Sequence, residues 1–204
     1  MSEQFIDRRS HRLLKARQPG EQPKLALFVG GLWWSSPVGS YDALIATVGE
    51  ALPDHDVVDF QYNSSVFSRS DPDQVAASLA EELRTALAEE GYASVILVGH
   101  SFGTVLIRSV VLDGHQAAIN DTSHWYHRLD RLVLLAPTNR GYEPTTLTQS
   151  AASSMAEMMQ WVPGLRIGRQ ALSVKRGSTW LNNFRLRWLD EFTPEQSPPP
   201  YTVV

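Results

Sequence analysis

The residues best suited to chemistry form the pentapeptide GHSFG at residues 99–103, which has the pattern G-x-S-x-G. An apolar run at residues 94–98 precedes it and another at residues 104–112 follows it, so the expected setting is a buried strand, a tight turn and a helix. In such a turn the neighbours of the serine must be small, and its hydroxyl projects above the carboxyl edge of the sheet. This context predicts a nucleophile at Ser101, whereas the pentapeptide alone would also fit an ordinary glycine-serine turn.

A serine nucleophile needs a general base, which is usually a histidine oriented by a carboxylate. The six histidines all precede residue 128: His11, His55, His100, His115, His124 and His127. The sharp turn should point His100 away from the serine hydroxyl, and the last three precede the next strand, at the amino edge of the sheet. Glu143, Asp190 and Glu191 are conceivable acids, but no base accompanies them. We predict that no imidazole lies within about 4 Å of the Ser101 hydroxyl.

Two of these histidines, His124 and His127, lie near Asp121 and Asp130 in the sequence and form the one grouping that resembles a metal site. No third histidine or carboxylate stands in a ligand-like register, so a solvated surface loop is the expected structure. Because the chain has no cysteine, thiolate zinc sites, disulfides and cysteine nucleophiles are excluded. We predict neither a metal nor any other cofactor.

Strand and helix signals alternate around the pentapeptide. Short apolar runs typical of buried strands occur at residues 24–29, 55–62, 94–98 and 131–136. Apolar residues at helical spacing lie between them, at residues 44–52, 75–87 and 104–112. The second helix is the clearest, because Asp71 and Pro72 supply a cap and a first-turn proline, and Gly91 follows its end. The alternation predicts an α/β fold, with a largely parallel sheet flanked by helices.

The chain divides into four expected segments: a mobile N-terminal arm at 1–23, an α/β core at 24–137, a helical lid insertion at 138–196, and the start of a further core strand at 197–204. The arm is polar and patternless. The insertion is rich in Met and Trp, and residues 158–189 include six basic residues and no acidic one. Because the insertion leaves one strand and returns to a neighbouring one, we expect it to pack over the carboxyl edge of the sheet.

Composition excludes several classes of protein. The 204 residues are 43% hydrophobic and 20% charged, which is typical of one globular domain rather than of a disordered or fibrous chain. A net charge of −4 gives the chain no overall electrostatic attraction to nucleic acid or to an anionic membrane. There is no apolar stretch of transmembrane length and no apolar core of a secretory signal, so we expect a cytoplasmic protein without a transmembrane segment.

At this point the sequence resembles the α/β-hydrolase family, most closely its bacterial serine esterase and lipase-like branch. The resemblance covers residues 24–138, with a fainter echo at residues 201–204, and depends on the GHSFG pentapeptide and on GGL at residues 30–32. Many members have histidine where this second motif begins with glycine. The resemblance implies that the fold is incomplete at the C-terminus, because the acid would follow the strand that begins near Tyr201 and the histidine would come one strand later.

The resemblance also implies roles for residues near the serine. The backbone N–H groups of Leu32 and Phe102 would form the oxyanion hole, since a developing alkoxide needs two preorganised donors. Trp33 and Trp34 would line the substrate pocket, although aromatic residues after a strand fit a plain core equally well. The expected function is cleavage of a carboxylic ester, or less readily a thioester or amide, through an acyl-enzyme on Ser101.

The expected substrate is a small-molecule or lipid-like ester, because Met side chains adapt to apolar chains. Without its acid and base the 204-residue chain should be a poor catalyst, and further C-terminal residues would have to supply them. The alternative is a non-catalytic binding or regulatory domain with the same fold: the absent base favours it and the intact pentapeptide opposes it. A dinucleotide site is excluded, because residues 29–34 lack a third glycine and place two indoles where pyrophosphate would approach.

Overall fold

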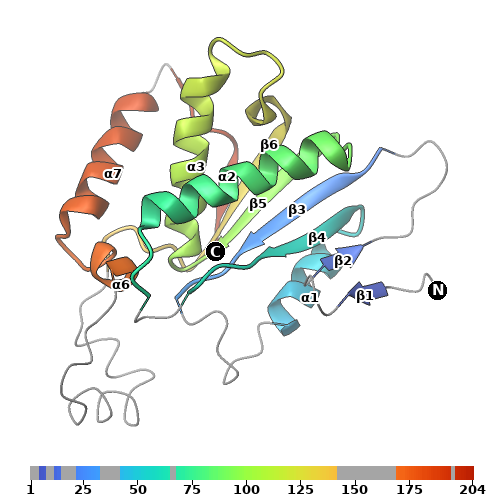
Figure 1. Cartoon of the computed structure of the whole chain (residues 1–204), viewed down its shortest axis with the longest axis horizontal. Coiled ribbons are helices and arrows are strands. Elements are labelled where there is room, and N and C mark those ends of the chain that lie inside the picture. The colour runs from blue at the N-terminus through green and yellow to red at the C-terminus, as the bar shows by residue number, and fades with distance from the viewer. Residues whose placement is uncertain are drawn as a thin grey trace, which may run out of the picture.

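A seven-stranded sheet, in the order β1-β2-β4-β3-β5-β6-β7, forms the centre of the computed structural model (Figure 1). The strands are β1 (Phe5–Asp7), β2 (Arg12–Leu14), β3 (Lys24–Val29), β4 (His55–Phe60), β5 (Ser94–His100), β6 (Leu129–Leu135) and β7 (Tyr201–Val203). The five strands from β4 to β7 in this order are parallel. The structure describes residues 5–7, 12–14, 22–32, 42–64, 68–141, 169–193 and 196–204.

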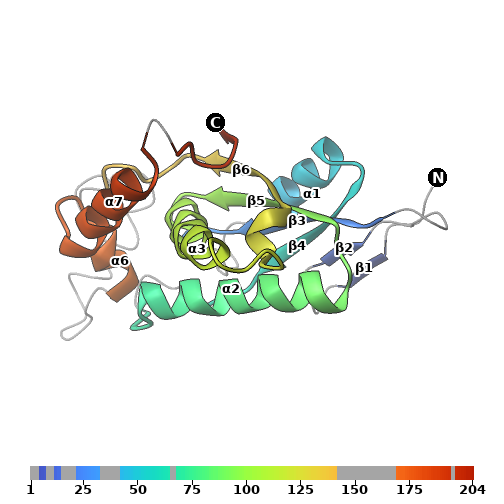
Figure 2. The ribbon, with the colours of Figure 1, turned by 90° about the horizontal axis from the view of Figure 1, so that it is seen from above.

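Helices cover both faces of the sheet, with α2 and α3 on one side and α1 on the other (Figure 2). The helices are α1 (Asp42–Ala51), α2 (Pro72–Glu89), α3 (Gly103–Ala118), the short 3₁₀ helix η1 (Trp125–Arg128), α6 (Arg169–Ser173) and α7 (Thr179–Glu191). This confirms the expected α/β fold with a parallel sheet flanked by helices. Of the helices described, none is both long and apolar enough to cross a bilayer.

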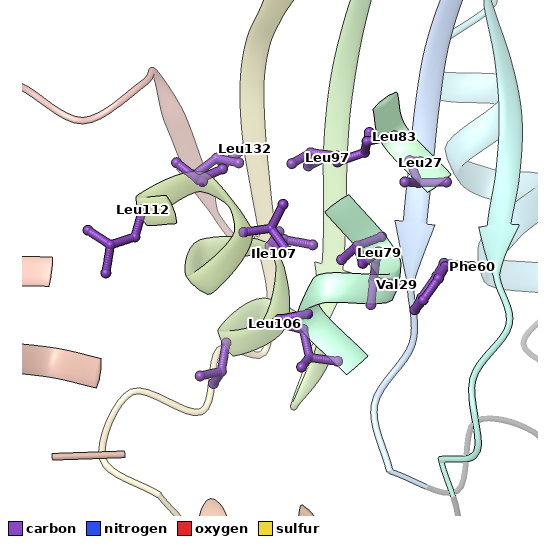
Figure 3. Close-up of a cluster of buried hydrophobic side chains, with 14 of the residues drawn as sticks. Leu27, Val29, Phe60, Leu79, Leu83, Leu97, Leu106, Ile107, Leu112 and Leu132 are labelled. Carbon is purple, nitrogen blue, oxygen red and sulfur yellow. The ribbon is translucent and has the colours of Figure 1, made fainter. Parts of the chain in front are cut away.

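The core has two parts because the central strand β3 is buried on both faces. Leu25, Leu27 and Val29 point toward α2 and α3, whereas Ala26 and Phe28 belong to a second cluster that includes α1. The close-up in Figure 3 shows the first cluster, in which the helices contribute Leu79, Leu83, Leu106, Ile107 and Leu112. Burial on both faces explains why this strand is a continuous apolar run instead of an alternating one.

The helix α2 forms as its sequence predicts. The Asp71 carboxylate accepts a hydrogen bond from the Asp73 backbone N–H at 3.0 Å, and Pro72 occupies the first turn. The apolar stripe of this helix is buried against the sheet and α3: Val75, Leu79, Leu83 and Leu87. Local capping and tertiary packing therefore favour the same helix.

The N-terminal region differs from the patternless arm expected for residues 1–23. Two short strands form there: β1 pairs antiparallel with β2, and β2 pairs antiparallel with β4 through Arg12↔Val58 and Leu13↔Val57. Strands of three residues are too short to show an alternating pattern, so periodicity could not reveal them. They extend the sheet beyond β4.

The helix α7 also lies in a different place from a lid over the carboxyl edge. It runs alongside α3, with Trp180 6.4 Å from Phe102 between ring centroids at one end and Glu191 Oε1 2.6 Å from His115 Nδ1 at the other. These contacts make α7 a third member of the α2–α3 layer. The start of α7 is near the carboxyl edge, and its end points toward the amino edge (Figure 1). Residues 142–168 of the expected lid lie outside the described residues.

Candidate active site

The backbone turn at Ser101 joins the end of β5 to the start of α3. Ser101 has a φ of 51°, in the left-handed region that residues with a side chain rarely adopt. Its N–H donates to the Leu135 carbonyl at 2.9 Å, and its carbonyl accepts from the N–H and the hydroxyl of Thr104 at 3.0 and 2.6 Å. Hydrogen bonds on both sides therefore hold the strained residue, as expected where a fold over-determines a functional position.

The two glycines of the pentapeptide are required by close backbone contacts. A Cβ at Gly99 would lie 2.8 Å from the Thr104 nitrogen, and one at Gly103 would overlap the Val29 carbonyl group and lie 2.7 Å from the Gly30 oxygen. Gly31 is similarly close, since its Cβ would lie 2.9 Å from Ser101 Cβ. These contacts bring the loop after β3 directly against the serine turn.

Two backbone amides at this junction are free to donate. Phe102 precedes the first residue of α3, and Leu32 follows Gly31 in the loop after β3. Within the described part of the chain, neither N–H makes a hydrogen bond. No side chain caps the start of α3, so the partial positive charge of that helix end also remains available. Both features suit a site where negative charge develops beside Ser101.

Tyr62, which no sequence motif singled out, supports this loop. Its hydroxyl donates to the Gly30 carbonyl at 2.8 Å. The ring stacks on Phe60 at 5.8 Å and lies 6.5 Å from Phe102. Burial raises the pKa of the phenol, so the hydroxyl keeps its proton and remains a donor. The signal available in the sequence was only an aromatic residue soon after a strand, which is common in cores.

No described histidine is hydrogen-bonded to the Ser101 hydroxyl. His100 adjoins the serine but packs over Gly31, where a Cβ would lie 3.4 Å from its Nδ1. Burial lowers the pKa of His100 and keeps its imidazole neutral. His55 is the first residue of β4, so it lies at the amino edge of the parallel sheet, away from the serine.

The other described histidines have structural contacts. His115 is bonded to Glu191 as noted above, and the second oxygen of that carboxylate accepts from Gln116 at 2.7 Å. The hydrogen bonds from Gln116 and His115 lower the pKa of Glu191. His124 Nδ1 caps η1, and His127 Nε2 lies 3.1 Å from the Asp121 carbonyl oxygen. Glu191 is therefore engaged far from Ser101 and is excluded as its catalytic acid.

Several residues singled out in the sequence fall outside the described part of the chain: His11, Trp33, Trp34 and Glu143. Asp190 is described and is exposed on α7. What the described residues do bring together is Ser101, the Gly30–Leu32 loop and the start of α3.

Many solved structures resemble this arrangement of strands and helices, and two of them illustrate the likeness. Phospholipase PlaB from Legionella pneumophila matches with a TM-score of 0.60 and 19% identity, over 88% of this chain and 38% of that protein. The Bacillus licheniformis lipase BlEst2 matches with a TM-score of 0.57 and 19% identity, over 92% of this chain and 66% of that protein. The fold is the α/β-hydrolase fold.

The likeness extends to the fold and not to sequence. No protein-family model matches the chain, and no curated protein matches it by sequence. The chain spans 38% of PlaB and 66% of BlEst2, so both proteins contain much that this sequence does not cover. The roles of individual residues therefore have to be argued from the geometry around Ser101.

Proposed function

We propose that this chain carries the nucleophile and the oxyanion hole of a serine hydrolase that cleaves carboxylic esters. The observation that supports it most is the turn at Ser101, whose positive φ is combined with flanking glycines at which a Cβ would collide with neighbouring backbone atoms. A connection that only joins a strand to a helix does not need a strained residue, which costs about 1 to 3 kcal/mol. It does present a hydroxyl at the carboxyl edge of the sheet.

In the proposed reaction, Ser101 Oγ attacks the ester carbonyl carbon and its proton passes to a general base. The negative charge that forms on the carbonyl oxygen is met by the N–H groups of Leu32 and Phe102. The base returns the proton to the departing alcohol, which leaves an acyl-enzyme on Ser101. Water then attacks this acyl group and releases the carboxylic acid. We assign Trp33 and Trp34 to the pocket that holds the substrate.

We place the general base and its acid outside the described residues. Each described histidine is packed or bonded away from the serine hydroxyl. The phospholipase and lipase names of the two similar structures are consistent with a lipid-like ester as substrate.

A fluorophosphonate probe tests the nucleophile. We expect the 204-residue chain to label slowly at Ser101, and exogenous imidazole to accelerate labelling by about tenfold or more, because general bases contribute about 10² to 10⁴ in rate. Ser101→Ala should abolish labelling with and without imidazole. Ser78→Ala, which removes an exposed hydroxyl on α2, is the matched control and should label like the unaltered chain. Imidazole-stimulated labelling that persists in Ser101→Ala would overturn the assignment.

The alternative is a non-catalytic domain with this fold. It is favoured because no described histidine is hydrogen-bonded to the serine hydroxyl, and it predicts no labelling of Ser101 even in the presence of imidazole. Imidazole-stimulated labelling of Ser101 therefore distinguishes the serine hydrolase from the non-catalytic domain.

A further inference from the structure

A guanidinium group on α3 lies largely out of water, and no carboxylate among the described residues pairs with it. Arg108 Nε donates to the Thr104 carbonyl at 3.0 Å, whereas its Nη2 is buried and makes no hydrogen bond within the described residues. Its guanidinium carbon lies 5.2 Å from the Phe184 ring centroid and 5.9 Å from that of Trp188. Burial, and then the charge of Arg185, lowers the pKa of Arg108 to about 10. A buried cation without a counter-charge is costly unless something pairs with it.

Arg108 lines a groove of about 220 Å³ between α3, the loop after β6 and α7. The groove combines positive, polar and aromatic side chains: Arg108, Asn139, Arg140, Phe184, Arg185 and Trp188. The three arginines come from three different elements and meet in one groove. None of them forms an ion pair with a carboxylate among the described residues.

Cation–π packing alone does not explain this arrangement. Stacking on Phe184 and Trp188 accounts for Arg108 as a link between α3 and α7. It gives no reason for Arg140 and Arg185 to line the same groove, because like charges repel and Arg185 already lowers the pKa of Arg108. A bound anion would account for the presence of all three arginines in one groove.

We propose that this groove binds a phosphate group. Guanidinium groups present several N–H donors in a planar fork that matches phosphate oxygens, and three of them suit a doubly charged tetrahedral anion. The Asn139 amide adds a neutral donor. The Phe184 and Trp188 rings supply an apolar wall for whatever the phosphate is attached to.

The groove lies toward the same end of α3 as Ser101. Arg108 is five residues after Gly103, the first residue of α3, which is about 8 Å along the helix axis, and its Nε reaches back to the Thr104 carbonyl. The loop that carries Asn139 and Arg140 follows β6, whose Leu135 carbonyl accepts from the Ser101 N–H. A phosphate-bearing ester could therefore place its headgroup in the groove and its carbonyl at the serine. This assignment to a substrate rests on the proposed function, whereas phosphate binding does not.

Titration calorimetry of the 204-residue chain at low salt tests the groove, with inorganic phosphate and glycerol 3-phosphate as probes. We expect saturable binding, weakened about tenfold by Arg140→Ala or by Arg185→Ala, since each removes a charge-assisted contact. Both side chains are exposed, so the fold should survive. Arg187→Ala is the matched control: it lies on the same helix, pairs with Asp113 at 2.5 Å and does not line the groove. It should change binding less than twofold, roughly the error expected of a distant site.

Absence of saturable phosphate binding, or equal weakening by Arg187→Ala, would overturn the proposal. The two probes distinguish the source of the phosphate. If glycerol 3-phosphate binds more tightly and slows fluorophosphonate labelling of Ser101, the phosphate belongs to a substrate. Equal affinity for both probes without any effect on labelling indicates a free phosphate ion. Phosphate binding in a chain that never labels would support the groove and reject the proposed function.

Discussion

Replacement of Ser101 by glycine should stabilise the protein while removing the hydroxyl of the proposed nucleophile. Ser101 has a φ of 51°, and the left-handed conformation costs a residue with a side chain about 1 to 2 kcal/mol. Glycine avoids this cost but adds about 0.4 to 1 kcal/mol of backbone freedom to the unfolded chain. The difference between these two terms lies between about 0 and 1.6 kcal/mol, so the free energy of unfolding should rise by about 0.8 kcal/mol.

Urea unfolding followed by circular dichroism measures this difference. Ser101→Ala is the essential comparison, because it removes the hydroxyl and keeps the Cβ, so it should not gain the stability of Ser101→Gly. Ala136, which follows β6 with a φ of 46°, offers a matched position, and Ala136→Gly should also stabilise. If Ser101→Gly proves less stable than Ser101→Ala, the turn is not strained and the argument from strain to function fails.

Three further variants test other parts of the site and the sheet. Gly103→Ala should lower the free energy of unfolding by about 1 to 3 kcal/mol in urea, because its Cβ would overlap the Val29 carbonyl group; an unchanged midpoint would contradict this. Tyr62→Phe should cost about 1 to 3 kcal/mol in the same assay and slow the labelling of Ser101, since the Gly30 carbonyl loses its donor. Both nitrogens of buried His55 lack hydrogen bonds among the described residues, and desolvation lowers its pKa below the unfolded value of 6.5. The unfolded state then binds more protons, so stability should be full above pH 6.5 and fall as the pH drops toward the folded pKa. His55→Phe should reduce this fall in melting temperature between pH 7.5 and 5.5, and an identical fall would contradict the assignment.

The parts of the fold that sequence could predict are those in which local and tertiary preferences agree. Both glycines of the pentapeptide around Ser101 lie where close contacts exclude a Cβ. The glycines in the sequence therefore already indicate the tight turn that the structure contains. The helix α2 has a capping aspartate, a first-turn proline and one apolar stripe, and each of these depends only on neighbours in the chain.

The parts that sequence could not predict depend on partners distant in the chain. β2 is a strand because Arg12 and Leu13 pair with β4, more than forty residues away. The position of α7 is decided by contacts with α3, such as Trp180 with Phe102, which no periodicity within α7 reveals. The hydrogen bond from Tyr62 to Gly30 spans 32 residues and joins two loops. Each of these segments could pair with more than one distant segment, and the local sequence does not show which pairing is the most stable.

The tight contact between Gly103 and the end of β3 decides how this site would respond to saturation mutagenesis. Because backbone atoms of α3 and of the loop after β3 touch directly, the positions of the two donor amides depend on main-chain packing more than on their own side chains. A library at the half-buried Leu32 should therefore yield many members that still label at Ser101 with fluorophosphonate and imidazole, and one at the buried Phe102 should retain large apolar residues. Libraries at Gly99 and Gly103 should return only the parent sequence. For the proposed hydrolase, substitutions elsewhere around Ser101 would then change the substrate range while the two donor amides stay in place.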